Sequence, residues 1–145
     1  MLSTLFSAWQ FREQCGTWQE AVQLACHPLE VQGVITHSYT QAIIHETEKH
    51  GPWYILSPEF ALPHARPDEG VIGSKTHLSL LSLKEAVLFP GHPDVRLIIV
   101  LAAANSTQHI EMIQQLVCWL DEAERLHQLS HTTSLAQLLS ILEVS

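Results

Sequence analysis

The chain has 145 residues, of which 46% are hydrophobic and 15% charged, so its size and composition fit one folded domain and exclude a disordered protein. Lys and Arg total 7 against 15 Asp and Glu, and the formal net charge of -8 argues against binding to nucleic acid or an anionic membrane. Histidine stands out with ten residues, and its chemistry suits proton transfer, metal binding and phosphoryl transfer.

The N-terminal third of the chain is predicted to be helical. Residues 17–20, Thr-Trp-Gln-Glu, have the form of a capping box, and apolar residues follow at helical spacing. Pro28 either kinks this helix or opens a second short one, and Gly33 ends the segment. Another capping box at residues 38–41 opens a further helix, which the Gly-Pro pair at 51–52 stops.

The middle of the chain changes to the short apolar segments that are typical of strands. We expect strands at residues 53–56, 60–62, 76–83, 86–89 and 95–104. A Pro-Gly-His-Pro-Asp cluster precedes the last of them and predicts a turn. That last strand is apolar almost throughout, so it is expected to be central and buried on both faces.

The last third returns to helical periodicity. Helices are expected after a cap at Ser106 or Thr107, after Asp121, and after Ser134. Helices, then mixed strands, then helices predict a single α/β domain over residues 1–145, with helices covering a sheet.

Neither targeting nor membrane insertion is expected from the sequence. Residues 1–14 lack the basic start and the sustained apolar region of a secretory signal. No stretch approaches the roughly 20 apolar residues that span a bilayer. The three cysteines are too few and too scattered for a disulfide framework. A cytoplasmic protein is therefore expected.

The densest group of candidate functional residues surrounds His64. This histidine follows an apolar strand and lies between Pro63, which fixes the approach of the chain, and Ala65, which leaves room for a reaction partner. Arg66 follows, and its guanidinium can hold anionic oxygens. A nucleophilic imidazole is one interpretation. An exposed turn histidine beside an unrelated arginine is the other, and the residues alone leave both open.

His109 is a second candidate, because it falls in the first turn of the helix after the predicted central strand. Free backbone N–H groups and the helix dipole favour an anion at that position. The carboxyl ends of strands collect functional groups in sheet-based domains, so His64 and His109 can meet there. A histidine on the helix surface, beside Ser and Thr caps, is the alternative.

The sequence Ala-Leu-Pro-His-Ala at residues 61–65 resembles the phosphorylation-site motif of mannitol/fructose-type enzyme IIA domains of the bacterial phosphotransferase system (PTS). The longer sequence through Pro67 is similar to the ascorbate-type branch of that group. Gly-Pro-Trp-Tyr at residues 51–54 and the downstream His109 extend the resemblance, which runs from about residue 18 to residue 120.

Three residues before this motif depart from the family pattern. Glu59 and Phe60 stand where the family usually has a small and an aliphatic residue, and Ser57 stands where Gly or Ala is common. A carboxylate aimed at a phosphoryl group would repel its charge. Glu59 is therefore expected to face solvent.

The resemblance implies both a fold and a function. It implies a mixed sheet of about five strands with helices on both faces, and a sugar-PTS IIA component that needs no cofactor. His64 would accept a phosphoryl group on its tele nitrogen from the histidine phosphocarrier protein HPr. It would then pass the group to a cysteine of a cognate IIB component, which serves the membrane component IIC. His109 would stabilise the phosphoryl group, and Arg66 is a candidate phosphate contact inferred from its proximity.

The sugar and the oligomeric state stay open, although ascorbate or a related pentitol or sugar acid fits the branch. A regulatory IIA-like protein, phosphorylated on the same histidine but acting by binding a target, is the alternative to a transport component. A histidine-based metal enzyme is a third reading, but we find no convincing carboxylates at ligand spacing from His64 or His109.

The other eight histidines are expected to be surface or capping residues, and no metal site is expected. His127 and His131 are four residues apart and could grip a metal on a continuous helix. A helix break is expected near Ser130, however, and the sequence places no third ligand beside them. Trp53 is expected to fill core contacts, as are the tryptophans at positions 18 and 119.

Overall fold

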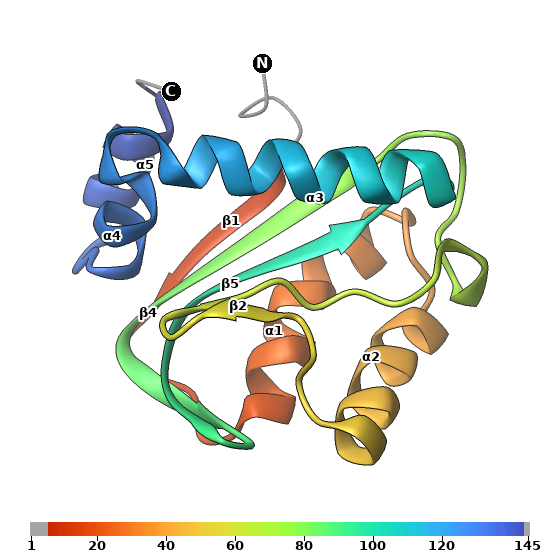
Figure 1. Cartoon of the computed structure of the whole chain (residues 1–145), viewed down its shortest axis with the longest axis horizontal. Coiled ribbons are helices and arrows are strands. Elements are labelled where there is room, and N and C mark those ends of the chain that lie inside the picture. The colour runs from red at the N-terminus through yellow and green to blue at the C-terminus, as the bar shows by residue number, and fades with distance from the viewer. Residues whose placement is uncertain (1–5, 144–145) are drawn as a thin grey trace.

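A mixed five-stranded sheet runs through the computed structural model, which describes residues 6–143 (Figure 1). The strands lie in the order β1-β4-β5-β3-β2. The pairs β1–β4 and β3–β5 are parallel, whereas β4–β5 and β2–β3 are antiparallel. The strand bounds are β1 (Phe6–Arg12), β2 (Ile55–Ser57), β3 (Phe60–Ala61), β4 (His77–Phe89) and β5 (His92–Ala102).

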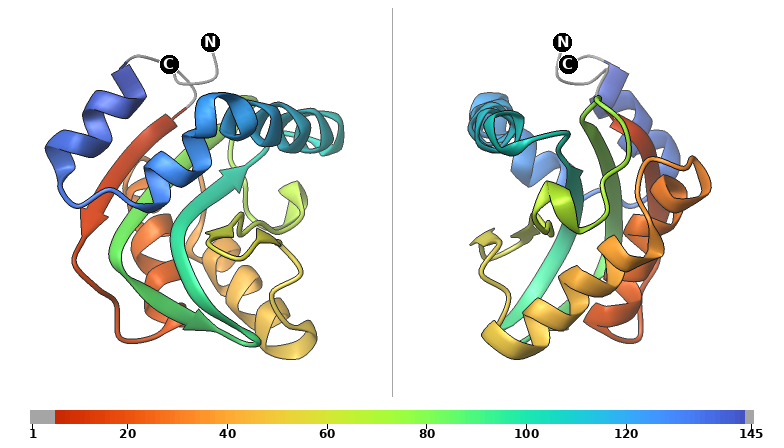
Figure 2. Two further views of the ribbon diagram at one scale, coloured as in Figure 1. Left: turned by 60° about the vertical axis from the view of Figure 1, so that its left-hand side comes forward. Right: turned by 90° about the vertical axis from the view of Figure 1, so that its right-hand side faces the viewer.

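Helices cover both faces of this sheet (Figure 2). One face packs against α1 (Trp18–Val31) and α2 (His37–His50), and the other packs against α3 (Ser106–Asp121), α4 (Arg125–Ser130) and α5 (Leu135–Glu143). Short 3-10 helices, η2 (Pro67–Glu69) and η3 (Glu122–Glu124), complete the described elements. Alternate side chains of β4 and β5 enter the two apolar cores, which confirms the predicted architecture.

Helix α1 continues through Pro28 to Val31, so the predicted alternative of a second helix opening at Pro28 is wrong. Thr17 caps its start as predicted, and its side chain accepts a hydrogen bond from the amide of Glu20 at 3.2 Å. Proline cannot donate to the carbonyl of Leu24, one helical turn earlier. The side-chain amide of Gln10, on β1, donates to that carbonyl instead at 2.8 Å. A contact from another element thus lets the helix run to Val31.

The prediction of an all-helical N-terminal third is wrong for β1. Its residues show no clean alternation of apolar and polar side chains, and the strand forms by parallel pairing with β4. Two predicted caps are also displaced. Thr36 caps α2 in place of Ser38, and Asn105 caps α3 in place of Ser106 or Thr107. In both cases the true cap is the residue whose backbone is extended and whose side-chain oxygen reaches a first-turn amide.

The two strands predicted at 76–83 and 86–89 form one strand, β4, whose pairing with β5 is irregular between Ser82 and Val87. The turn predicted before β5 is shorter than expected and centres on the Pro-Gly pair at 90–91. β5 is the central strand of the sheet and is buried along most of its length, as predicted. The helix expected directly after Asp121 begins only at Arg125, beyond η3.

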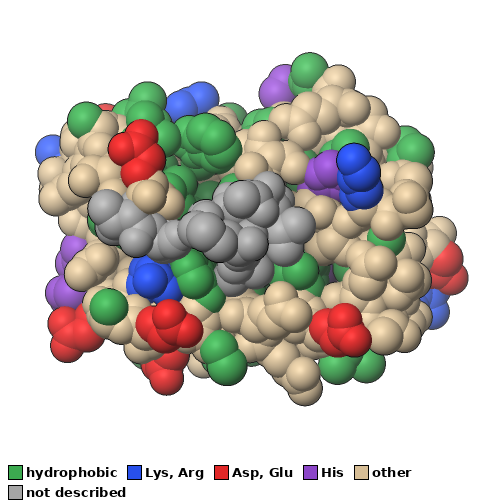
Figure 3. Space-filling view, turned by 90° about the horizontal axis from the view of Figure 1, so that it is seen from above, with side chains coloured by type: hydrophobic (Ala, Val, Ile, Leu, Met, Phe, Trp, Pro, Cys, Tyr) green, Lys and Arg blue, Asp and Glu red, His purple; other side chains and the backbone are tan. Residues whose placement is uncertain are grey.

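Within residues 6–143, no helix is long and apolar enough to cross a membrane. Seen from above the sheet, Lys and Arg side chains stand apart from one another (Figure 3). Residues 1–5 and 144–145 lie outside the described residues. They include both ends of the domain predicted over residues 1–145 and part of the segment, residues 1–14, in which no secretory signal is expected.

Candidate functional site

His64 lies on a short extended segment that is fixed to the sheet on both sides. The amide of Leu62 donates to the carbonyl of Tyr54 at 3.1 Å, and the amide of Leu101 donates to the carbonyl of Pro63 at 3.1 Å. The Nδ1 atom of His64 lies 2.7 Å from the carbonyl oxygen of Leu62. In a neutral ring Nδ1 must carry the proton to make this bond, so the lone pair is left on Nε2.

The ring of His109 lies against the ring of His64. Their centroids are 4.7 Å apart and their planes meet at 72°, so the structure brings these two predicted residues together. His109 lies in the first turn of α3, which the side chain of Asn105 caps. The Nδ1 atom of His109 is buried and has no hydrogen-bond partner among the described residues. A buried polar atom without a partner costs about 1–3 kcal/mol, so the ring of His109 is left with an unmet hydrogen bond in this structure.

Both rings are held in the neutral form near neutral pH. Burial lowers the pKa of His64 below its ordinary value of 6.5, and the neighbouring His109 lowers it further, while the hydrogen bond to Leu62 raises it in part. Burial also lowers the pKa of His109. A neutral His64 keeps the Nε2 lone pair that nucleophilic attack requires.

We expect the ring protons of His64 and His109 to titrate with midpoints below 6.5 in an NMR pH titration of the folded chain. Because the unfolded chain then binds more protons than the folded one, the free energy of unfolding should fall as the pH drops below 6.5 through these lowered values. The H64A/H109A double variant should lose part of that pH dependence. Midpoints at or above 6.5 for both rings would contradict the neutral pair.

A cavity of about 560 Å³ opens in front of the two histidines, and its wall includes two residues that the sequence analysis did not assign to the site. Trp53 was expected in the core, but 46% of it is exposed, and its ring lies edge-on to that of His64 at a centroid distance of 6.1 Å. His50, at the end of α2, also lines the cavity and pairs with Glu46 at 3.5 Å. The Gly-Pro pair in the sequence predicted where α2 ends, but not that this end lies beside the site.

Arg66 lines the same cavity, but its charge is partly offset by neighbouring carboxylates. Its Nε atom lies 3.0 Å from Glu69 and 3.6 Å from Asp68, and 78% of the side chain is exposed. The two terminal guanidinium nitrogens make no hydrogen bond within the described part of the chain. These nitrogens are free to meet an anion in the cavity.

Tyr39 fixes the backbone next to His64, although no motif marked it. Its hydroxyl donates to the carbonyl of Leu101 at 2.7 Å and accepts the amide N–H of Ala65 at 3.1 Å. Burial raises its pKa, so the phenol stays protonated and can donate. A Cβ on Gly70 would lie 2.8 Å from the Cβ of Tyr39, so only glycine fits beside this ring.

Glu59 is turned away from His64 and does not line the cavity. The prediction that it faces solvent is wrong in part, because 33% of its side chain is exposed and it contacts the end of α4. Ser130 Oγ donates to Glu59 Oε2 at 3.0 Å, and His131 Nε2 lies 3.5 Å from Glu59 Oε1. These contacts direct the carboxylate away from the phosphoryl site that the sequence predicts.

Comparison with known proteins gives one consistent family. Residues 7–144 match the family model described as phosphoenolpyruvate-dependent sugar phosphotransferase system, EIIA 2. The ascorbate-specific PTS system EIIA component of Escherichia coli (strain K12) is 33% identical over 138 residues, which cover 92% of this chain and 88% of that protein.

Two solved structures share the fold. The solution structure of the mannitol-specific cryptic phosphotransferase enzyme IIA CmtB from Escherichia coli is 39% identical, with a TM-score of 0.89 over 99% of both chains. The complex of enzyme IIAMTL and phosphorylated enzyme IIBMTL from Escherichia coli contains a chain that is 28% identical. Its TM-score is 0.73, over 94% of this chain and 94% of that one.

Proposed function

The chain belongs to the family of phosphoenolpyruvate-dependent sugar phosphotransferase system EIIA 2 proteins, and from this premise we propose that His64 carries a phosphoryl group between two partner proteins. The donor is the phosphohistidine of HPr, and the acceptor is a cysteine of a cognate IIB component. The chain acts on the cytoplasmic side of the membrane, where its role is to supply phosphoryl groups for the uptake of a sugar.

The observation that carries this proposal is the hydrogen bond from His64 Nδ1 to the carbonyl of Leu62 at 2.7 Å. That bond holds the proton on Nδ1 and leaves Nε2 as the nucleophile. Nε2 attacks the phosphorus of the donor phosphohistidine, so that a new P–N bond forms as the donor P–N bond breaks. In the second transfer a cysteine thiolate attacks the same phosphorus, a P–S bond forms, and His64 leaves with its lone pair restored.

His109 and Arg66 stabilise the charge of the transferred group in this proposal. Phosphoryl transfer needs little beyond a positioned nucleophile and electrostatic stabilisation of the phosphoryl oxygens. A phosphoryl group on His64 would enter the space beside the His109 ring, whose Nδ1 lacks a partner in the structure. Arg66 lines the same cavity, so its guanidinium can supply positive charge there.

The experiment that tests the proposal is a phosphoryl relay assembled from purified proteins. The full chain is incubated with labelled phosphoenolpyruvate, enzyme I and HPr, and a IIB component is then added. We expect an acid-labile label on the chain that moves to the IIB cysteine. A chain that is never labelled would refute the proposal, and a chain that is labelled but passes the group to no IIB would point to the regulatory alternative.

The transported compound belongs in this proposal to the sugar acids and sugar alcohols. The relatives support that class, because one is named as ascorbate-specific and another as mannitol-specific. Comparing IIB proteins of the two systems as acceptors in the same relay identifies the cognate partner.

A further inference from the structure

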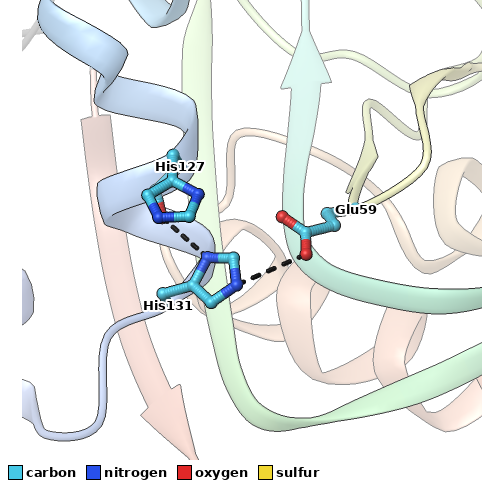
Figure 4. Close-up of side chains that lie close together, drawn as sticks. All are labelled: Glu59, His127 and His131. Atoms are coloured by element: carbon cyan, nitrogen blue, oxygen red, sulfur yellow. Dashed lines mark hydrogen bonds and ion pairs between the residues drawn. The ribbon is translucent and has the colours of Figure 1, made fainter.

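Three side chains from two distant parts of the chain meet outside the cavity that His64 lines (Figure 4). Glu59 comes from the turn between β2 and β3, and His127 and His131 come from α4 and the residue that ends it. One ligand atom from each lies within 4.8 Å of the other two. We propose that this group, the Glu59–His127–His131 cluster, binds a divalent transition-metal ion, with Zn²⁺ as its preferred occupant.

The donor set fits zinc. Two imidazole nitrogens and one carboxylate oxygen are ligands that Zn²⁺ commonly takes, with water completing a tetrahedron. The two rings come from positions four apart and lie side by side, with centroids 4.2 Å apart and planes tilted by 33°. Helix α4 ends at Ser130, where the sequence predicted a break, and His131 follows directly as its C-cap, so the break does not separate the two rings.

A hydrogen bond through Nδ1 already holds the ring of His131 in the orientation that metal binding through Nε2 requires. Its Nδ1 lies 2.9 Å from the carbonyl oxygen of His127, which can only accept, so Nδ1 carries the proton. A histidine that binds a metal through one nitrogen usually donates from the other to a carbonyl or carboxylate, which fixes the ring orientation. His131 Nε2 therefore keeps its lone pair and can bind a metal ion. This atom points toward Glu59 (Figure 4).

Glu59 is supported in the same way. One carboxylate oxygen, Oε2, accepts the hydroxyl of the buried Ser130 at 3.0 Å, which leaves Oε1 for the cluster. The carbonyl of Glu59 accepts the backbone amides of Arg96 and Leu97, both at 3.0 Å, so its backbone is fixed to β5. Metal-binding carboxylates are commonly held by such additional hydrogen bonds.

The contact between His131 and Glu59 is unsatisfied unless something positive lies between them. With the proton on Nδ1, the neutral ring presents the Nε2 lone pair to Glu59 Oε1 at 3.5 Å, so two acceptors face each other. Protonation of Nε2 gives an ion pair, and a metal ion bound to both atoms gives a coordinate bond to each. The nearby His127 ring adds a second nitrogen ligand, which favours the metal.

The surroundings of the cluster are acidic. Glu59 and His127 border a hollow of about 640 Å³, whose wall also carries three further carboxylates and one cation. Negative charge around a site attracts cations and raises their local concentration. The further carboxylates are those of Asp94, Asp121 and Glu124, and the cation is Arg96.

Zinc binding to the full, untagged chain tests the proposal, in competition with a chromophoric chelator at pH 7.5. We expect one Zn²⁺ per chain with a dissociation constant in the micromolar range or below. Removing a ligand from a three-residue site should weaken binding at least about tenfold, in H131A and separately in E59Q. The same zinc should raise the melting temperature of the wild-type chain by a few degrees, because the three ligands are brought together only in the folded form.

Two control variants separate this cluster from other histidines. H27A removes an exposed histidine of α1, and H64A removes one ring of the His64–His109 pair; both should leave zinc affinity unchanged. The proposal is overturned if the wild-type chain fails to bind zinc in the micromolar range, or if H131A and E59Q weaken binding less than about tenfold. It is also overturned if H64A abolishes binding. H127A is a third ligand variant and should also weaken zinc binding at least about tenfold.

Discussion

H64A is expected to abolish phosphoryl labelling by phosphoenolpyruvate, enzyme I and HPr. Alanine removes the only group proposed to form the P–N bond, and no other described histidine combines a carbonyl-bound Nδ1 with a place in the same cavity. Labelling should therefore fall to the background of the assay, and the acid-labile product should disappear. The measurement is the amount of labelled chain against time, with donor protein in excess.

H64Q and H27A are the matched variants for this experiment. Glutamine retains much of the volume of His64 but cannot hold a phosphoryl group through a ring nitrogen, so it should also fail to label. H27A alters an exposed histidine on α1 and should label like the wild-type chain. Amide NMR spectra check that each variant is folded. Persistent labelling of folded H64A or H64Q would show that another residue is the acceptor.

H109A is expected to slow phosphoryl transfer by about two orders of magnitude without abolishing it, because losing one charge-stabilising donor typically costs that much. The nucleophile of His64 remains, so labelling should reach the wild-type level at long times. The measurement is the rate constant for transfer from HPr, followed by the rate of transfer to IIB.

The H77A variant is the control for this second experiment. Burial lowers the pKa of His77 as it does for His109, but His77 lines a different hollow and pairs with Ser7. H77A should therefore keep the wild-type rate. H109Q should recover part of the rate, since its amide can still donate a hydrogen bond. Equal rates for H109A and the wild-type chain would remove His109 from the transfer step.

Local sequence signals predicted most of the fold and the family. The cap at Thr17, the helix stop at Gly51 and the apolar β5 are determined by neighbours in the chain, and each is confirmed. The similarity carried by residues 61–65 is likewise confirmed by the family match over residues 7–144. The predictions that were wrong concern elements whose structure depends on contacts with residues far away in the sequence. Strand β1 depends on β4, and α1 passes Pro28 because Gln10 occupies the freed carbonyl.

The residues of the candidate site likewise fall into those that the sequence could predict and those that it could not. His64 and His109 could be selected because each sits at a recognisable local position, after a strand and at a helix start. Tyr39 could not, since its partners Ala65 and Leu101 lie 26 and 62 positions away and any buried aromatic side chain would satisfy the helical pattern. Glu59 and Ser130 are 71 positions apart, so no spacing rule connects them.

The hydroxyl of Tyr39 ties α2, the residue after His64 and the central strand into one unit. Exposing the His64 segment by local opening would break contacts in the middle of the sheet, and such openings require free energies near that of global unfolding. The partner proteins proposed to exchange a phosphoryl group with His64 would therefore meet a surface that is already in place, and we expect them to dock as rigid bodies. Their association rates are set by diffusion, orientation and charge. With a net charge of -8 on this chain, added salt should slow the approach of a basic partner.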